Sequence, residues 1–95
     1  MKNTDIEKRL IGVERVIAVY GINDSEPPIE EIKIDINVDI LKTIVTAKED
    51  DPLLYDGYVL NEYQLAKINQ YLKSEIVPKF EIYRYVLEAT GIYDW

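Results

Sequence analysis

The clearest pattern in this chain is a strict alternation of apolar and polar residues in its first half. The apolar members are Ile32, Ile34, Ile36 and Val38. The polar residues between and after them are Lys33, Asp35, Asn37 and Asp39. Because successive side chains of a strand point to opposite faces, this alternation predicts a β-strand with one packed face and one face in water.

An earlier strand is expected at residues 13–22. Its continuous apolar run, Val16 to Val19, is typical of a central or long first strand that is buried on both faces. Residues 23–28 predict a loop, because two prolines and an Asn-Asp pair oppose a hydrogen-bond ladder. The two strands would then form an antiparallel hairpin with a longer-than-minimal loop.

The residues before this hairpin allow two interpretations. A capping-box pattern at residues 4–7 favours a short helix near residues 4–10. In the alternative, Leu10 and Ile11 already belong to the first strand, with Gly12 at a bulge.

From Asp39 onward the apolar spacing changes to that of a helix, with Asp39 as the expected cap. The apolar stripe of this helix would consist of Ile40, Leu41, Ile44 and Val45. The β-branched run at residues 43–46 weakens the helix, and Pro52 favours its ending before or near Asp51.

A second helix is better specified. Asn61 stands at its N-cap and Gln64 at the reciprocal capping position. Its apolar stripe would consist of Leu65, Ile68 and Leu72. The first member of this stripe can pack back onto Leu60, whereas Tyr63 points away from the stripe at ~100° per residue. Lys73 would fall in the last turn, where a cation suits the helix dipole.

Residues 80–89 predict a final strand whose two faces are both rich in apolar residues, followed by a short tail at 91–95 that should dock its aromatic residues. The elements would follow the order β-β-α-α-β, with a short N-terminal helix in one interpretation. This order indicates an α+β fold, a small antiparallel sheet with two helices on one face, in a single domain spanning residues 1–95. The other face would stay open unless a terminus or a partner covers it. It would carry Lys33, Asp35 and Asn37 together with one apolar-rich face of the last strand.

Composition excludes most enzyme chemistries. The chain has 95 residues and contains neither histidine nor cysteine, so Ser–His and Cys–His catalysis and thiolate-bound zinc are impossible. Its glycines are isolated and match no phosphate-binding or dinucleotide-binding loop. We therefore expect a protein without enzyme activity and without a cofactor.

The formal net charge of −7 indicates which partners the chain can attract. Such a charge opposes direct binding to nucleic acid or to an anionic membrane surface, and it attracts a basic protein. No segment approaches the ~20 apolar residues that span a bilayer, and the N-terminus lacks the apolar region of a signal peptide. We expect a cytoplasmic protein, whose acidity either attracts a basic protein partner or serves only solubility.

Residues 49–63, here called the connector, join the two predicted helices and concentrate carboxylates and tyrosines without a basic residue. Exposed tyrosines are frequent at interface hot spots, and neighbouring carboxylates can pair with a partner's Arg or Lys. The candidate partner-binding residues are Asp50, Asp51, Tyr55, Asp56, Tyr58, Glu62 and Tyr63. In the alternative interpretation, Leu53, Leu54 and Tyr55 anchor a loop and the acids are merely solvated. Tyr55 and Tyr58 could belong to either the core or the surface.

Two further acidic patterns are weaker indications. The carboxylates of Glu49, Asp50, Asp51 and Asp56 could in principle supply oxygen ligands to a metal ion. Their spacing does not match a calcium-binding loop, so no metal site is expected. A second acidic run comprises Asp24, Glu26, Glu30 and Glu31. It would either keep a hairpin loop soluble or form a second arm of the same basic-partner site.

The connector also resembles a known family. Its pattern D-D-P-x-x-Y-x-x-Y-x-L-x-x-x-Q is similar to that of small bacterial domains of unknown function often encoded near polymorphic toxins, and it resembles immunity proteins of contact-dependent growth inhibition systems. The matching residues are Asp50, Asp51, Pro52, Tyr55, Tyr58, Leu60 and Gln64. With the compatible hairpin and closing strand, the resemblance spans residues 13–90.

This resemblance implies an immunity protein that binds and neutralises a cognate toxin domain. If that toxin is a nuclease, it should be basic around its active site, which an acidic surface bearing tyrosines could occlude. We expect the immunity protein to be a monomer when free. The alternative is a non-enzymatic structural or self-associating module that pairs through its open sheet face or an exposed edge strand.

Overall fold

The computed structural model describes residues 10–23 and 27–93. Its elements are β1 (Leu10–Gly21), β2 (Glu30–Ile34), α2 (Val38–Ile44), β3 (Tyr58–Val59), α3 (Glu62–Asn69) and β4 (Tyr83–Tyr93). The predicted α+β fold is confirmed, and the connector adds a strand, β3, that the sequence did not predict. The helix considered near residues 4–10 lies outside the described residues.

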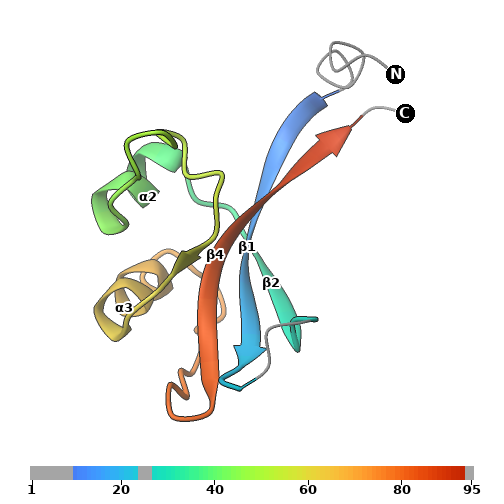
Figure 1. The fold of residues 1–95 in the computed structure, drawn as a ribbon. Coiled ribbons are helices and arrows are strands. Elements are labelled where there is room, and N and C mark those ends of the chain that lie inside the picture. Colours follow the sequence, from blue (N-terminus) through green and yellow to red (C-terminus); the bar gives the residue numbers. More distant parts are fainter. Residues whose placement is uncertain (1–9, 24–26, 94–95) are drawn as a thin grey trace.

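The described strands form one antiparallel sheet in the order β2-β1-β4-β3 (Figure 1). The long strands β1 and β4 occupy its centre, and their register pairs Ile17 with Leu87. The apolar run at residues 16–19 is buried along its whole length, as predicted for a central strand. The alternative interpretation of the N-terminal residues is also confirmed, since β1 begins at Leu10 and its pairing is irregular between Leu10 and Gly12.

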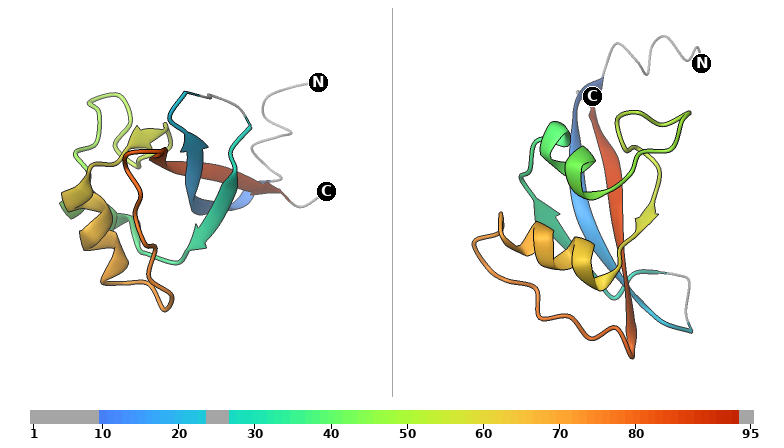
Figure 2. Two further views of the ribbon diagram at one scale, coloured as in Figure 1. Left: turned by 90° about the horizontal axis from the view of Figure 1, so that it is seen from below. Right: turned by 90° about the vertical axis from the view of Figure 1, so that its left-hand side faces the viewer.

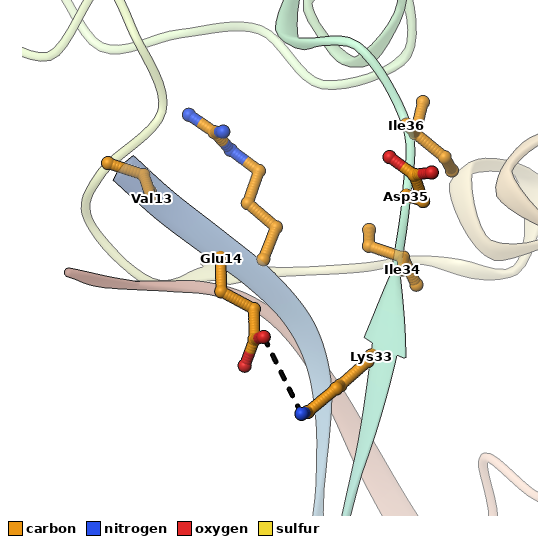
Figure 3. Close-up of a pocket in the computed structure, with 7 residues that line it drawn as sticks. Val13, Glu14, Lys33, Ile34, Asp35 and Ile36 are labelled. Atoms are coloured by element: carbon orange, nitrogen blue, oxygen red, sulfur yellow. Dashed lines mark ion pairs between the residues drawn. The ribbon is translucent and has the colours of Figure 1, made fainter. Parts of the chain in front are cut away.

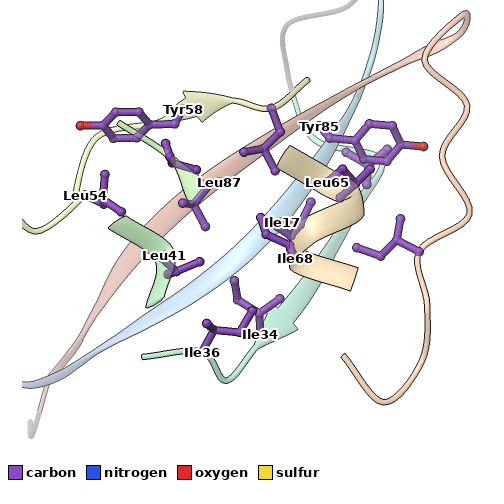
Figure 4. Close-up of a cluster of buried hydrophobic side chains, with 14 residues drawn as sticks. Ile17, Ile34, Ile36, Leu41, Leu54, Tyr58, Leu65, Ile68, Tyr85 and Leu87 are labelled. Atoms are coloured by element: carbon purple, nitrogen blue, oxygen red, sulfur yellow. The ribbon is translucent and has the colours of Figure 1, made fainter. Parts of the chain in front are cut away.

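Both helices lie on the same side of the sheet (Figure 2), and the core fills the space between them and the strands (Figure 4). The fully buried large side chains are Ile17, Leu41, Leu54, Leu65, Ile68 and Leu87. Burying one such side chain contributes roughly 1.5–3 kcal/mol. This single cluster therefore holds α2, the connector and α3 against β1 and β4.

The helix-free face has a small apolar floor that polar side chains cover. Ala18 and Val86 pair across β1 and β4 and are 0% and 7% exposed, although neither belongs to the core cluster. The Tyr20 hydroxyl donates to Glu88 Oε2 at 2.6 Å, and the register places this bond diagonally across the Ala18–Val86 pair. Arg84 lies 5.2 Å from the centre of the Tyr20 ring. The face expected to be open is thus bridged by its own side chains.

The boundary between β2 and α2 differs from the prediction. The strand ends at Ile34 although Ile36 remains buried, and Val38 belongs to the helix. The expectation that Asp39 caps α2 is wrong: Asn37 is the N-cap, and its side chain accepts a hydrogen bond from the Asp39 N–H at 2.7 Å. An Asx side chain two residues earlier satisfies the free N–H and stops the alternation.

The first helix ends before Asp51, as expected, but Val45 of its predicted apolar stripe lies outside it. It ends at Ile44, well before Pro52, and Val45 is already extended. The β-branched run at residues 43–46 accounts for this early end, because such residues lose side-chain freedom in a helix. The chain therefore enters the connector through residues 46–48, which belong to no regular element.

The capping of α3 is as predicted. The Asn61 side chain accepts from the Gln64 N–H at 2.8 Å, and the Gln64 side chain accepts from the Asn61 N–H at 2.9 Å. The helix ends at Asn69, so the expectation that Lys73 stands in its last turn is wrong, and Lys67 takes that place. The Asn69 side chain ends the helix by exchanging two 2.9 Å hydrogen bonds with the backbone of Ile76.

The last strand is displaced toward the C-terminus. It begins at Tyr83, where Phe80 was expected, and it continues to Tyr93. Residues 80–82 form a turn that leads into the strand. The predicted tail therefore includes strand residues, because β1 begins at Leu10 and offers pairing partners along that length.

Candidate functional site

The connector is organised around one buried carboxylate. Asp51 is only 7% exposed, and its side chain accepts hydrogen bonds from the N–H groups of Tyr55 and Asp56, both at 2.8 Å. The Tyr58 hydroxyl donates a third hydrogen bond at 2.7 Å. A buried carboxylate requires such partners, since its desolvation is otherwise costly. Asp51 thus fixes the path of the connector.

Tyr58 links this loop to the core. Tyr58 is 8% exposed, and it belongs to the hydrophobic cluster that also contains Leu54 and Leu87 (Figure 4). Besides donating to Asp51, its hydroxyl accepts the Lys48 N–H at 3.1 Å. Its backbone begins β3, where it pairs with Leu87. Tyr58 therefore joins the two ends of the loop from Lys48 to Tyr58.

The two residues have opposite pKa shifts. Burial raises the pKa of the Asp51 carboxyl. Hydrogen bonds from Asp56, Tyr58 and Tyr55, together with the charge of Lys48, lower the pKa by more than burial raises it, so that it lies below its ordinary value of 3.8. Burial raises the pKa of the Tyr58 hydroxyl above 10.0 against the lowering effect of the Lys48 N–H, and the negative Asp51 and Asp56 add to the rise. At neutral pH the pair is a carboxylate and a neutral phenol.

The tight turn of this loop requires an unusual backbone conformation. The Leu54 N–H donates to the Asp51 carbonyl at 3.2 Å, and Leu54 has a φ of 58°, in the left-handed region that glycine prefers. A leucine in this conformation costs about 1–2 kcal/mol. Its side chain is 0% exposed, and its burial offsets that cost.

Arg15 holds the loop from the neighbouring sheet. It lies on the same face of β1 as the core residue Ile17, and its Nη2 donates to the Leu53 carbonyl at 2.6 Å. Its guanidinium lies 5.7 Å from the centre of the Tyr55 ring. Arg15 was not among the predicted site residues, although a charged residue at a core-facing strand position indicates that its side chain has a partner.

The remaining candidate residues of the loop are on the surface. Tyr55 is 50% exposed, and Asp50 and Asp56 are exposed as well. The Asp56 Oδ2 lies 3.5 Å from the Nζ of Lys48, and both side chains are more than half exposed. Such an exposed ion pair contributes little to stability, so its charges can be exchanged for those of another protein.

A second exposed group lies on the first turn of α3, beyond β3. Tyr63 is 67% exposed, and Glu62 beside it is exposed. The Nζ of Lys67 lies 5.5 Å from the centre of the Tyr63 ring. Val59 of β3, 63% exposed, separates the two groups along the chain. The prediction that Tyr63 points away from the core is confirmed.

The structure therefore divides the seven candidate residues. Asp51 and Tyr58 are buried and bonded to each other. The exposed candidates are Asp50, Tyr55, Asp56, Glu62 and Tyr63. Four residues of the family pattern make the contacts that shape the connector and cap α3. They are Asp51, Tyr58, Leu60 and Gln64. In this chain these four residues determine how the segment folds.

The described residues contain no grouping of three or more acidic side chains that could hold a metal ion. Both oxygens of Asp51 already accept hydrogen bonds. The second acidic run does not extend the site: Glu30 and Glu31 lie in β2, at the opposite edge of the sheet from β3, and Asp24 and Glu26 are outside the described residues.

A hollow of about 390 Å³ lies between β1 and the end of β2 (Figure 3). Its lining residues are Val13, Glu14, Arg15, Lys33, Ile34, Asp35 and Ile36. The charges in it are of both signs, and Lys33 and Glu14 pair at 3.6 Å. We assign it no ligand. Neither helix in the described part of the chain is long and apolar enough to cross a membrane.

Comparison with known proteins gives one match. Residues 14–88 match a family described as a domain of unknown function, DUF7683. The matched region runs from β1 to β4 and includes the whole connector. No curated protein and no solved structure matches the chain.

Proposed function

The chain belongs to the DUF7683 family, and we propose that it is a cytoplasmic immunity protein that binds and neutralises the toxin domain of a bacterial contact-dependent inhibition or similar polymorphic toxin system. Binding would be stoichiometric, without chemistry by this chain. The exposed connector residues would cover a basic active site of the toxin, such as that of a nuclease.

One observation supports this proposal above others: exposed tyrosines and carboxylates lie on a segment whose backbone is held by the buried Asp51 carboxylate and by the N-cap of α3. Tyr55 directly follows the turn fixed by Asp51, and Tyr63 stands on a helix with a complete capping box. Ordering a loop on binding lowers affinity, so a segment that is already fixed loses less. Tyrosine adds contact area at low entropic cost.

Charge supports a basic partner. The net charge of −7 would speed the encounter with a basic toxin at low salt. The cations near the exposed candidates are Arg15, Lys48 and Lys67, and all three lie outside the connector. A partner's Arg or Lys could replace Lys48 in its solvent-exposed ion pair with Asp56 at little cost, because exposed ion pairs contribute only about 0–1 kcal/mol.

The proposal is tested with the protein encoded next to this chain. Co-expression should give a complex of the two, and expression of this chain should protect cells from that protein. A neighbour that is toxic but neither binds this chain nor is neutralised by it contradicts the proposal.

The interface is tested with a charge-matched pair of variants. Asp56→Lys with Glu62→Lys should slow association with the neighbour and flatten its salt dependence. Glu75→Lys with Glu81→Lys changes the net charge equally at exposed residues outside the connector. If both double variants slow association to the same extent, only the overall charge matters and the connector is not the interface.

A further inference from the structure

The two edges of the sheet differ in how well they are closed. The β3 edge is only two residues long, and the chain turns directly from it into α3. The β2 edge is five residues long, Glu30–Ile34, and β2 pairs only with β1 among the described strands. A free edge of this length presents unpaired backbone groups that can accept another strand.

The hydrogen-bond register determines which residues of β2 present these groups. The Tyr85 carbonyl of β4 accepts the Leu60 N–H at 2.8 Å on the β3 side. Just before β4, the Ile82 carbonyl accepts the Ile22 N–H at 3.0 Å on the β1 side. Odd-numbered residues of β4 thus turn their backbone groups toward β3, and even-numbered residues turn theirs toward β1. The alternation of an antiparallel sheet extends this parity to the next strands.

In β1, the even-numbered residues direct their backbone N–H and C=O groups toward β4, so the odd-numbered residues direct theirs toward β2. Their partners in β2 are Glu30, Ile32 and Ile34. Glu31 and Lys33 therefore direct their N–H and C=O groups outward, where no described residue bonds to them through its backbone. Their side chains lie on the helix-free face, and both residues are exposed.

The possible registers of a second copy of β2 on this edge differ in the charges that they bring together. If a two-fold axis passes through Ile32, Glu31 of each copy stands opposite Lys33 of the other, with four backbone hydrogen bonds between them. If the axis passes through Glu31, that residue faces its own copy. If it passes through Lys33, that residue faces its own copy and Glu31 faces Asp35. Of these three registers, the one centred on Ile32 places opposite charges together. An axis through Ile34 would pair Lys33 with Asp35, but Asp35 lies beyond the end of β2.

The helix side of the edge has room for the second strand. Two hollows of about 460 and 470 Å³ lie beside β2 and share Ile32 in their lining. The segment from Tyr71 to Val77 lines part of both hollows, and Lys79, Tyr83 and Tyr85 also line the first. In the register centred on Ile32, the two copies of that isoleucine meet on this side and bury apolar surface.

We propose that this chain forms a weak symmetric dimer by antiparallel pairing of β2 with β2 of a second copy, with Ile32 on the two-fold axis. The two sheets then continue into one. This replaces the monomer expected from the sequence and develops the self-association alternative. It does not depend on toxin binding, because the connector lies at the opposite edge of the sheet and stays exposed in both copies.

Sedimentation equilibrium on four forms of the full chain tests the proposal. The wild type should show concentration-dependent dimerisation. Glu31→Lys and Lys33→Glu should each raise the dissociation constant about tenfold or more, because two attractive pairs become repulsive. The double variant, Glu31→Lys with Lys33→Glu, should return to within a few-fold of wild type. An equimolar mixture of the two single variants should also associate, since their charges complement each other.

These variants separate the proposed register from general charge effects. Glu31→Lys makes the chain less negative, so simple repulsion between copies predicts a tighter dimer, whereas the register predicts a weaker one. Glu31→Pro removes an outward N–H while leaving the ladder to β1 intact, and it should abolish the dimer with little change in Tm. A monomer at every concentration up to millimolar, or a dimer indifferent to the charge exchange, overturns the proposal.

Discussion

The hydroxyl of Tyr58 lies 2.7 Å from Oδ2 of Asp51 and donates a hydrogen bond to it inside the connector. Both residues were candidates for contact with a partner, and the structure joins them to each other. The same hydroxyl accepts the Lys48 N–H, and the same carboxylate accepts the N–H groups of Tyr55 and Asp56. This small network gives the acidic loop a fixed shape.

Replacing the central carboxylate should loosen the loop. Asp51→Asn retains the shape of the side chain but leaves one accepting oxygen for three donors, so at least one N–H or O–H loses its bond in a buried place. We expect Tm to fall by roughly 5 °C or more in thermal unfolding. The neighbouring exposed Asp50→Asn serves as the control and should leave Tm nearly unchanged. Equal effects of the two substitutions would remove Asp51 from its central role.

The same pair gives the loop a defined response to pH. The pKa of Asp51 is lower in the folded chain than in the unfolded chain, so its contribution to stability is present above about pH 4 and is lost as pH falls through the folded pKa. The pKa of Tyr58 is raised, so its contribution is present below about pH 10 and is lost as pH rises further. Denaturant unfolding across pH should show that Asp51→Asn reduces the acid loss and Tyr58→Phe the alkaline loss. Profiles that run parallel to wild type would contradict this assignment.

The positive φ of Leu54 predicts an unusual order of stabilities. Leu54→Ala should lower the free energy of unfolding by about 2–5 kcal/mol through the lost core contact. Elsewhere glycine is usually less stable than alanine, but at this φ Leu54→Gly should be as stable as Leu54→Ala or more so. Leu65, in the middle of α3, is the comparison site, where the glycine variant should be less stable by about 1 kcal/mol. The same order at both sites would argue against the left-handed turn.

Arg15 should stabilise the loop from a distance in the sequence. Arg15→Ala removes the hydrogen bond to the Leu53 carbonyl and the contact with the Tyr55 ring, and we expect a loss of about 1–2 kcal/mol in chemical unfolding. Lys73→Ala removes an exposed cation outside the connector and is the control. Hydrogen exchange of the Tyr55 and Asp56 amides should speed up in the Arg15 variant, since these N–H groups depend on the position of the loop.

Tyr63 should separate stability from binding. Its ring is 67% exposed, so Tyr63→Ala should change the free energy of unfolding by no more than about 0.5 kcal/mol. If the proposed interface is right, the same substitution should weaken the complex with the neighbouring toxin by tenfold or more, as at an aromatic hot spot. Exposed Tyr71→Ala, which lies after α3, provides the control. Unchanged toxin affinity in the Tyr63 variant would exclude α3 from the interface.

Local patterns were sufficient for most elements of the fold. The alternation around Ile32 and Ile34, the apolar run of β1 and the capping box of Asn61 and Gln64 are each determined by residues close together in the chain. The errors were also local: Asn37 caps α2 in place of Asp39, and β4 begins at Tyr83. Element ends depend on which residue supplies a cap or finds a pairing partner, and several neighbours could have done so.

The sequence by itself determined the α+β class, the acidic charge and the absence of histidine and cysteine chemistry, because these depend on periodicity and composition. Only the tertiary structure decided that Asp51 and Tyr58 turn inward while Tyr55 stays exposed. That choice depends on β3 pairing with β4 and on Arg15 reaching Leu53 across 38 positions of the chain. A carboxylate or a phenol has the same local preferences in either place, and burial is set by which distant segments meet.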